Sequence, residues 1–223
     1  MNATTCLTWL LIAGSAAAAQ PTNESPAHKR VQTVIDQVEK TCLEGPVYMI
    51  GPKKAQRLAG LVREAKPRLV VECGTALGYS GLWIGRELQA AGRGRLISIE
   101  LSPDRVRQAE ANFRKAGLDK IITVRQGDAR EVVKKLEGPI DFLFIDCGYS
   151  NYHPILTTLE GKLSDKATVV ADNVGIGARG MKDYLDHVRL KYKSRTEWFD
   201  LKLPWAKRDA MEISVAGREQ TQN

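Results

Sequence analysis

The sequence has few of the residues from which proteins build metal clusters and disulfide frameworks. It contains four cysteines and three histidines in 223 residues, and no two cysteines are spaced as C-x-x-C. A structural zinc site is therefore not expected. Cys73 and Cys147 fall at the ends of predicted strands, and we interpret them as small buried side chains rather than as nucleophiles.

No long run of basic residues accompanies the formal net charge of +7. Basic side chains are interleaved with acidic ones, as in Lys182-Asp183 and Lys207-Arg208-Asp209. This pattern is typical of a solvated surface, so we expect no nucleic-acid partner. Glycine, proline and charged residues occur at ordinary frequencies, and 43% of the residues are hydrophobic. The composition therefore predicts a folded domain with its own core.

The apolar stretch Cys6–Ala19 is shorter than the ~20 residues that a membrane-spanning helix needs. Ala17-x-Ala19 before Gln20 is typical of a signal-peptidase site, although residues 1–5 contain no Lys or Arg. We predict that residues 1–19 are a cleaved signal, which would make the protein secreted or periplasmic. The alternative is a short membrane anchor with the domain in the cytoplasm, because the first positive side chains follow the segment. The remaining predicted parts are a linker over 20–27, one domain over 28–217 and a tail over 218–223.

Residues 69 to 100 contain a strand, a glycine turn, a helix and a second strand. The first strand is Leu69–Cys73, Gly74 opens the turn, and Arg95–Glu100 is the second strand, which ends in an acid. This order is typical of a nucleotide-binding βαβ unit. The glycines are not spaced as G-x-G-x-x-G, and Glu72 suits a cationic ligand better than a phosphate. Glu100 would accept hydrogen bonds from ribose hydroxyls, as an acid does in NAD and S-adenosylmethionine (SAM) sites.

Helical and extended patterns alternate along most of the chain. Two helices are predicted before the βαβ unit, over residues 28–43 and from Pro52 to just before Pro67. After the unit we predict helices over 103–116, 129–136, 152–161 and 179–190, and strands over 121–125, 140–146, 167–173, 195–202 and 210–216. This alternation predicts an α/β fold with a doubly wound, mostly parallel, seven-stranded Rossmann-like sheet and N-terminal helices.

Polar oxygens follow two successive strands of this predicted sheet. Asp146 ends one strand, and Asp172-Asn173 end the next. Because parallel strands end at the same edge of a sheet, two carboxylates and an amide oxygen would meet at one point. Such hard oxygen ligands suit Mg²⁺, with Ca²⁺ as the alternative. The competing interpretation is structural: Asp172-Asn173 would cap the next turn, and Asp146 would hold a loop.

Five motifs together resemble one family. In chain order they are E-C-G-T-A-L-G-Y-S, L-I-S-I-E, Q-G-D-A, F-I-D and V-A-D-N. They resemble the catechol and caffeoyl-CoA type O-methyltransferases, which are metal-dependent enzymes with a class I methyltransferase fold that use SAM. The resemblance covers about residues 47–215. It implies that the cofactor site contains Gly51, Glu72, Gly74, Thr75, Ser80, Glu100, Ala129 and Asp146, and that the metal ligands are Asp146, Asp172 and Asn173.

The resemblance implies direct methyl transfer to a hydroxyl of a small substrate, with a vicinal aromatic diol as the expected class. The family commonly has a lysine base three residues after the first metal aspartate, and here that position is Tyr149. Tyr149 is therefore the candidate catalytic residue, with His153 as an alternative base. Two other hypotheses stay open at this point: a cofactor-binding homologue without turnover, and an NAD-dependent oxidoreductase. We expect a monomer or a homodimer.

Overall fold

The computed structural model describes residues 25–217, so the predicted leader and tail lie outside the described residues. The helix predicted from residue 28 begins at Pro26, where the hydroxyl of Ser25 accepts a hydrogen bond from the His28 amide. In the described part of the chain, no helix is long and apolar enough to cross a membrane. The α-helices are α1 (Pro26–Glu44), α2 (Pro52–Ala65), α3 (Tyr79–Ala91), α4 (Pro103–Ala116), α5 (Ala129–Val132), α6 (Tyr152–Leu159) and α7 (Lys182–Lys191).

Seven strands form one sheet with the order β3-β2-β1-β4-β5-β7-β6. The first five strands in the chain pair in parallel, and β7 pairs antiparallel with both β5 and β6. This confirms the predicted mostly parallel, doubly wound sheet. The strands are β1 (Leu69–Cys73), β2 (Arg95–Glu100), β3 (Ile122–Gln126), β4 (Ile140–Ile145), β5 (Leu163–Ala171), β6 (Lys193–Leu203) and β7 (Ala206–Val215).

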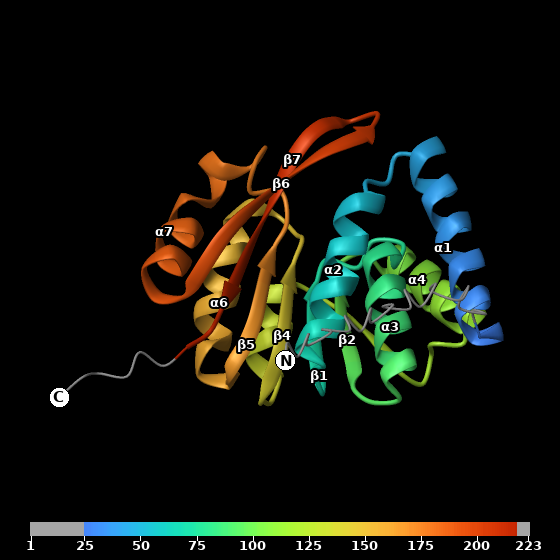
Figure 1. The fold of residues 1–223 in the computed structure, drawn as a ribbon, viewed down its shortest axis with the longest axis horizontal. Coiled ribbons are helices and arrows are strands. Elements are labelled where there is room, and N and C mark those ends of the chain that lie inside the picture. The colour runs from blue at the N-terminus through green and yellow to red at the C-terminus, as the bar shows by residue number, and fades with distance from the viewer. Residues whose placement is uncertain (1–24, 218–223) are drawn as a thin grey trace, which may run out of the picture.

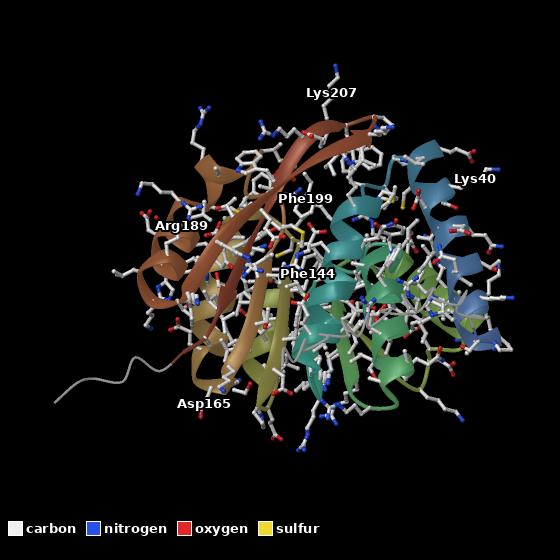
Figure 2. The ribbon with its side chains drawn as sticks, in the orientation of Figure 1. Lys40, Phe144, Asp165, Arg189, Phe199 and Lys207 are labelled. Carbon is white, nitrogen blue, oxygen red and sulfur yellow. The ribbon has the colours of Figure 1, made fainter. Side chains whose placement is uncertain are left out.

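Helices cover both faces of the sheet, as Figure 1 shows. Successive residues of a strand point to opposite faces, so β4 contributes to two cores. Phe142 and Phe144 pack with α1 to α4, whereas Leu143 and Ile145 pack with α6 and α7. All four side chains are fully buried, and Figure 2 shows Phe144 near the middle of the molecule. A continuous apolar run is what a central parallel strand needs, because both of its faces are covered.

The last two strands are longer than the sequence pattern predicts. They form a hairpin in which Trp198 pairs with Ala210 and Asp200 pairs with Arg208. Figure 1 shows this hairpin extending beyond the other strands, and Figure 2 shows Lys207 at its outer end. On β6, Leu201 and Leu203 are buried and pack with the core. At the start of β7, Lys207 and Arg208 are both exposed, so no apolar alternation marks this part of the strand. At the tip of the hairpin, Leu203 lies against Gly51, just before α2.

Candidate active site

The turn after β1 packs directly on the end of β4. Gly74 has φ 109°, a conformation that side chains with a Cβ rarely adopt. A Cβ on Gly74 would lie 1.8 Å from the backbone oxygen of Asp146. The absence of a side chain at Gly74 therefore lets the glycine turn and the first predicted metal ligand lie together.

Glu72 is hydrogen-bonded to side chains that pack against this turn, and it does not line the cavity described below. It is fully buried. Its carboxylate accepts a hydrogen bond from the Ser80 hydroxyl at 2.5 Å and another from the Ser98 hydroxyl. Ser98 in turn shares a hydrogen bond with the Thr75 hydroxyl. Burial raises the pKa of Glu72 to about 7, although the two serine hydrogen bonds oppose this shift. Glu72 thus reaches a ligand only through its neighbours.

Glu100, at the end of β2, is tied to the same turn. One carboxylate oxygen accepts a hydrogen bond from the Ala76 amide at 2.8 Å, and the other accepts one from the Ser102 amide at 2.9 Å. Each oxygen has two lone pairs, so both oxygens retain capacity for a further donor. These two backbone bonds fix the carboxylate at the cavity wall, because Glu100 also lines the cavity.

One cavity of about 710 Å³ lies at the carboxyl ends of β1, β2, β4 and β5. This volume is typical of a small-molecule or cofactor site. Gly51 does not line it, because Gly51 packs against Leu203 of the hairpin, and its neighbours Met49 and Ile50 form that part of the wall. The predicted site residues that line the cavity are Gly74, Thr75, Ser80, Glu100, Ala129, Asp146, Tyr149, Asp172 and Asn173.

The predicted metal ligands lie at one end of this cavity. Asp146 and Asp172 follow the paired strands β4 and β5, and the Asp172 amide donates to the Ile145 oxygen at 3.0 Å. Burial raises the pKa of Asp146 well above its ordinary value, and the nearby Asp172 raises it further. Burial also raises the pKa of Asp172 to about 6, although Lys54 opposes this shift. The two acids therefore favour a nearby positive charge.

Two charged residues behind this cavity end were not among the predicted site residues. Lys54, in the first turn of α2, is 1% exposed, and its ammonium donates to Asp172 Oδ1 at 2.8 Å and to Asp209 Oδ2 at 2.5 Å. Asp209, on β7, is fully buried. Sequence carried one signal for Lys54: it precedes Leu58 by four residues, so it lies on the buried face of α2. Asp209 carried a signal as well: the family has an acid near its C-terminal strand, and Arg208-Asp209 fall at about that position, although Asp209 was not assigned to the site.

The donor set fits a hard cation in its chemistry. Asp146, Asp172 and Asn173 offer carboxylate and amide oxygens, which Mg²⁺ and Ca²⁺ prefer. Among residues 25–217 no group of three or more His, Cys, Asp and Glu side chains by itself suits a metal ion. The predicted set contains only two such side chains, and its third ligand is an amide. Any cation held here would therefore keep water or substrate oxygens as further ligands.

Tyr149 lines the cavity near these acids and is 39% exposed. Burial raises the pKa of its phenol, and Asp209, Asp146 and Asp172 raise it further. A phenol with a raised pKa stays protonated at neutral pH and donates hydrogen bonds instead of accepting a proton. His153 lies on α6 outside the cavity wall, with its ring 5.1 Å from that of His187. Of the two candidate bases, Tyr149 and His153, only Tyr149 therefore lies at the cavity.

A seven-stranded sheet with this order and a cavity at its parallel strand ends define a Rossmann-like methyltransferase fold. A family model described as "Methyltransferase domain" matches residues 71–174. Catechol O-methyltransferase from Sus scrofa is 33% identical over 147 residues, which are 63% of this chain and 77% of that protein. Catechol O-methyltransferase from Bos taurus is 29% identical over 184 residues, which are 79% of this chain and 66% of that protein.

Solved structures show the same fold. The O-methyltransferase from Bacillus cereus in complex with SAH superposes with a TM-score of 0.71 at 20% identity, covering 87% of this chain and 92% of that one. The chain belongs to the catechol O-methyltransferase family. The resemblance inferred from the five sequence motifs is thereby confirmed.

Proposed function

We propose that this protein is a SAM-dependent O-methyltransferase that methylates one hydroxyl of a small aromatic vicinal diol and uses a divalent cation. One observation carries the proposal: a single cavity joins Glu100 at one wall to Asp146, Asp172 and Asn173 at another. The relatives named catechol O-methyltransferase support the diol substrate. The Bacillus cereus complex with SAH supports the cofactor.

The residues on the β1 and β2 side of the cavity suit SAM. Glu100 would accept hydrogen bonds from the ribose hydroxyls, because its two backbone bonds leave lone pairs on both oxygens. Ala129 would lie by the adenine, and Gly74 and Thr75 by the methionine portion. Glu72 would act indirectly, because its carboxylate is hydrogen-bonded to Ser80 and, through Ser98, linked to Thr75.

The residues on the β4 and β5 side suit a divalent cation, with Mg²⁺ as the first choice and Ca²⁺ as the alternative. Asp146, Asp172 and Asn173 would hold it. Asp146, Asp172 and Asp209 provide three carboxylates against the one ammonium of Lys54, so the cavity end retains negative charge. A divalent cation at this position would lower the pKa of a bound substrate hydroxyl.

The chain's own residues give the substrate an aromatic surface. Tyr48 and Trp205 both line the cavity, and their rings meet edge to face with centroids 5.3 Å apart. Tyr48 is 70% exposed, so its ring has free surface. Such rings favour a flat aryl group. Tyr149, which stays protonated, would donate a hydrogen bond to a substrate oxygen.

A methyl-transfer assay over a panel of phenols and catechols tests the proposal, run with Mg²⁺, with Ca²⁺ and with EDTA. We expect turnover of vicinal diols and its loss in EDTA. Asp146→Ala should lower turnover by at least about 100-fold, because it removes a cation ligand. Unchanged turnover of Asp146→Ala would show that the cation assignment is wrong.

A second candidate function is favoured by the residue at position 149. Tyrosine replaces the lysine base of the family, and its raised pKa makes it a poor proton acceptor. A homologue that binds the cofactor without turnover would share every other feature of the site. Calorimetry separates the candidates: SAH binding without any methyl transfer over the panel would support the second. Binding of NADH in place of SAH would contradict both.

The leader and the assembly stay predictions. We propose a cleaved signal over residues 1–19, with the membrane anchor as the alternative outcome, and a monomer or homodimer. Determining whether the native protein begins at Met1 or near Gln20 distinguishes the two fates of the leader.

A further inference from the structure

Lys54 has an uncommon position for a lysine. Its side chain is 1% exposed, although lysine is almost never fully buried without a partner. The ammonium donates to Asp172 on β5 and to Asp209 on β7, at 2.8 and 2.5 Å. Burial alone would lower the pKa of Lys54, but Asp172 and Asp209 raise it above its ordinary value. Lys54 does not line the cavity, so it acts on a ligand only through the acids it holds.

The first of these acids is a predicted cation ligand. Lys54 takes Oδ1 of Asp172, which leaves Oδ2 free of that partner. A carboxylate held at one oxygen cannot rotate freely, so the orientation of the other oxygen is fixed as well. Asp172 itself is 1% exposed and lines the cavity.

The second acid fixes the other ligand that follows β5. Asp209 Oδ2 accepts a hydrogen bond from Asn173 Nδ2 at 2.9 Å in addition to that from Lys54. Asp209 Oδ1 accepts from the amides of Gly175 at 3.1 Å and Ile176 at 2.9 Å. Because the amide nitrogen of Asn173 is engaged with Asp209, its side-chain oxygen is the atom left to accept or to ligate.

Asp172 and Asn173 thus each have one side-chain polar atom hydrogen-bonded to the Lys54–Asp209 pair, and the remaining side-chain oxygen of each is available to a ligand. The Asp146 carboxylate, by contrast, has no side-chain hydrogen bond among residues 25–217: burial and neighbouring charges are what shift its pKa, and it lines the cavity. Partners behind a ligating side chain commonly set its orientation in metal sites. Lys54 also keeps Asp172 and Asp209 from repelling each other, since it bonds to both.

We propose that Lys54 and Asp209 form a positioning pair for the divalent-cation ligands, in which Lys54 orients the Asp172 carboxylate and Asp209 orients the Asn173 amide. The proposal rests on the proposed function, because it needs a cation at Asp146, Asp172 and Asn173. The two possible effects of Lys54 on cation binding have opposite signs. A positive charge beside a cation site should weaken binding, whereas a positioning residue should strengthen it.

Mn²⁺ binding to the full-length protein tests the pair, measured by electron paramagnetic resonance with Mg²⁺ as competitor. We compare wild type with Lys54→Met and with Lys53→Met. Lys53 is the exposed neighbour in the same turn of α2, so its variant loses the same charge without touching the acids. We expect Lys54→Met to bind Mn²⁺ about 10-fold more weakly, or worse, and Lys53→Met to match wild type.

The outcomes separate this inference from the function on which it rests. Wild type that binds no Mn²⁺ contradicts the cation part of the proposed function and the pair with it. If wild type binds Mn²⁺ and Lys54→Met binds it equally or more tightly, the pair alone is overturned. Tighter binding is what removal of the positive charge of Lys54 predicts by itself, and equal binding would show no positioning effect. If Lys54→Met does not unfold cooperatively, Lys54→Gln replaces it. Its NH₂ group has two N–H donors on a side chain that is one bond shorter than that of lysine. Mn²⁺ binding by Lys54→Gln should therefore be weakened less than by Lys54→Met, and binding equal to or tighter than wild type would overturn the pair.

Discussion

The rings of Tyr48 and Trp205 meet edge to face across the cavity rim, with centroids 5.3 Å apart and an interplanar angle of 66°. Tyr48 lies between α1 and α2, whereas Trp205 lies at the tip of the β6–β7 hairpin. Two segments far apart in the chain therefore form one aromatic surface of the cavity. This surface lies on the hairpin side, where Figure 1 shows β6 and β7 approaching α2.

Trp205→Ala should impair binding of an aromatic substrate. Losing one aromatic contact of this kind corresponds to a rise in KM of about 2- to 10-fold, with little change in kcat. Steady-state kinetics with a catechol measure this, and calorimetry with SAH checks that the cofactor end is intact. Leu190→Ala, at a residue of α7 that is 87% exposed and does not line the cavity, is the control and should leave both constants unchanged. A fall in kcat with unchanged KM would contradict a substrate-binding role for Trp205.

Gly74→Ala should destabilise the protein strongly. The new Cβ would lie 1.8 Å from the backbone oxygen of Asp146, and φ at this position is 109°. Because the clash is with backbone, no side-chain rotation relieves it, and we expect a loss of more than about 3 kcal/mol in the free energy of unfolding. Urea denaturation followed by circular dichroism measures it.

Gly161→Ala is the matched control for that variant. A Cβ at Gly161 would meet nothing within 4 Å. Its effect should stay within about 0.5 kcal/mol of zero. Similar losses for the two variants would mean that the close approach of the glycine turn to β4 does not hold the site together.

The sheet was predictable because its strands are buried on both faces and read as apolar runs, as in Ile140–Ile145. The start of β7 was missed for the opposite reason: Lys207 and Arg208 are exposed side chains at the outer end of the hairpin, so no apolar pattern marks them. The acids at the cavity were predictable because parallel strands end at one edge. Each of them directly follows or ends a strand that the periodicity identified.

What could not be predicted were the partners supplied by distant segments. Lys54 meets Asp172 across 118 positions of the chain and Asp209 across 155. A single sequence does not show which helix start lies over which strand end, so the buried ion pairs were missed. Glu72 was expected beside the cofactor, yet two serine hydroxyls turn its carboxylate inward. Strand position located that acid correctly, but the direction of its side chain depends on packing.

The buried Glu72 should give the protein a specific dependence of stability on pH. Its pKa is about 7 in the folded state against an ordinary 4.5, mainly because burial disfavours the charged form. The folded state therefore binds the proton more tightly than the unfolded state. The stability that the folded state gains from this tighter proton binding is fully present below about pH 4.5 and is lost as the pH rises through 7.

Glu72→Gln removes this dependence because glutamine does not ionise. Relative to wild type, the variant should gain up to about 3 kcal/mol in the free energy of unfolding between pH 4.5 and pH 8. Urea denaturation of both proteins at several pH values measures the difference, and titrations common to both cancel. Glu110→Gln, on the exposed face of α4, serves as control. A wild-type-minus-variant difference that stays constant with pH would show that Glu72 ionises alike in both states.

Tyr149 offers a direct test of how the substrate loses its proton. Burial and three neighbouring aspartates raise the pKa of its phenol, so it cannot serve as a base near neutral pH. Tyr149→Phe should therefore retain kcat within about 3-fold, since only a hydrogen-bond donor is lost. Turnover should instead depend on the substrate, and catechols with more acidic hydroxyls should react faster at pH 7.

Tyr149→Lys should restore the residue that the family commonly has at this position. At saturating Mg²⁺ it should raise kcat for weakly acidic catechols by about 10-fold or more and reduce the dependence of kcat on substrate acidity, because a positioned base then assists deprotonation. Single-turnover rates over a series of substituted catechols measure both effects. Loss of activity in Tyr149→Phe with unchanged SAH binding would assign the phenol a direct catalytic part. A flat response of wild type to substrate acidity would mean that proton removal does not limit the rate.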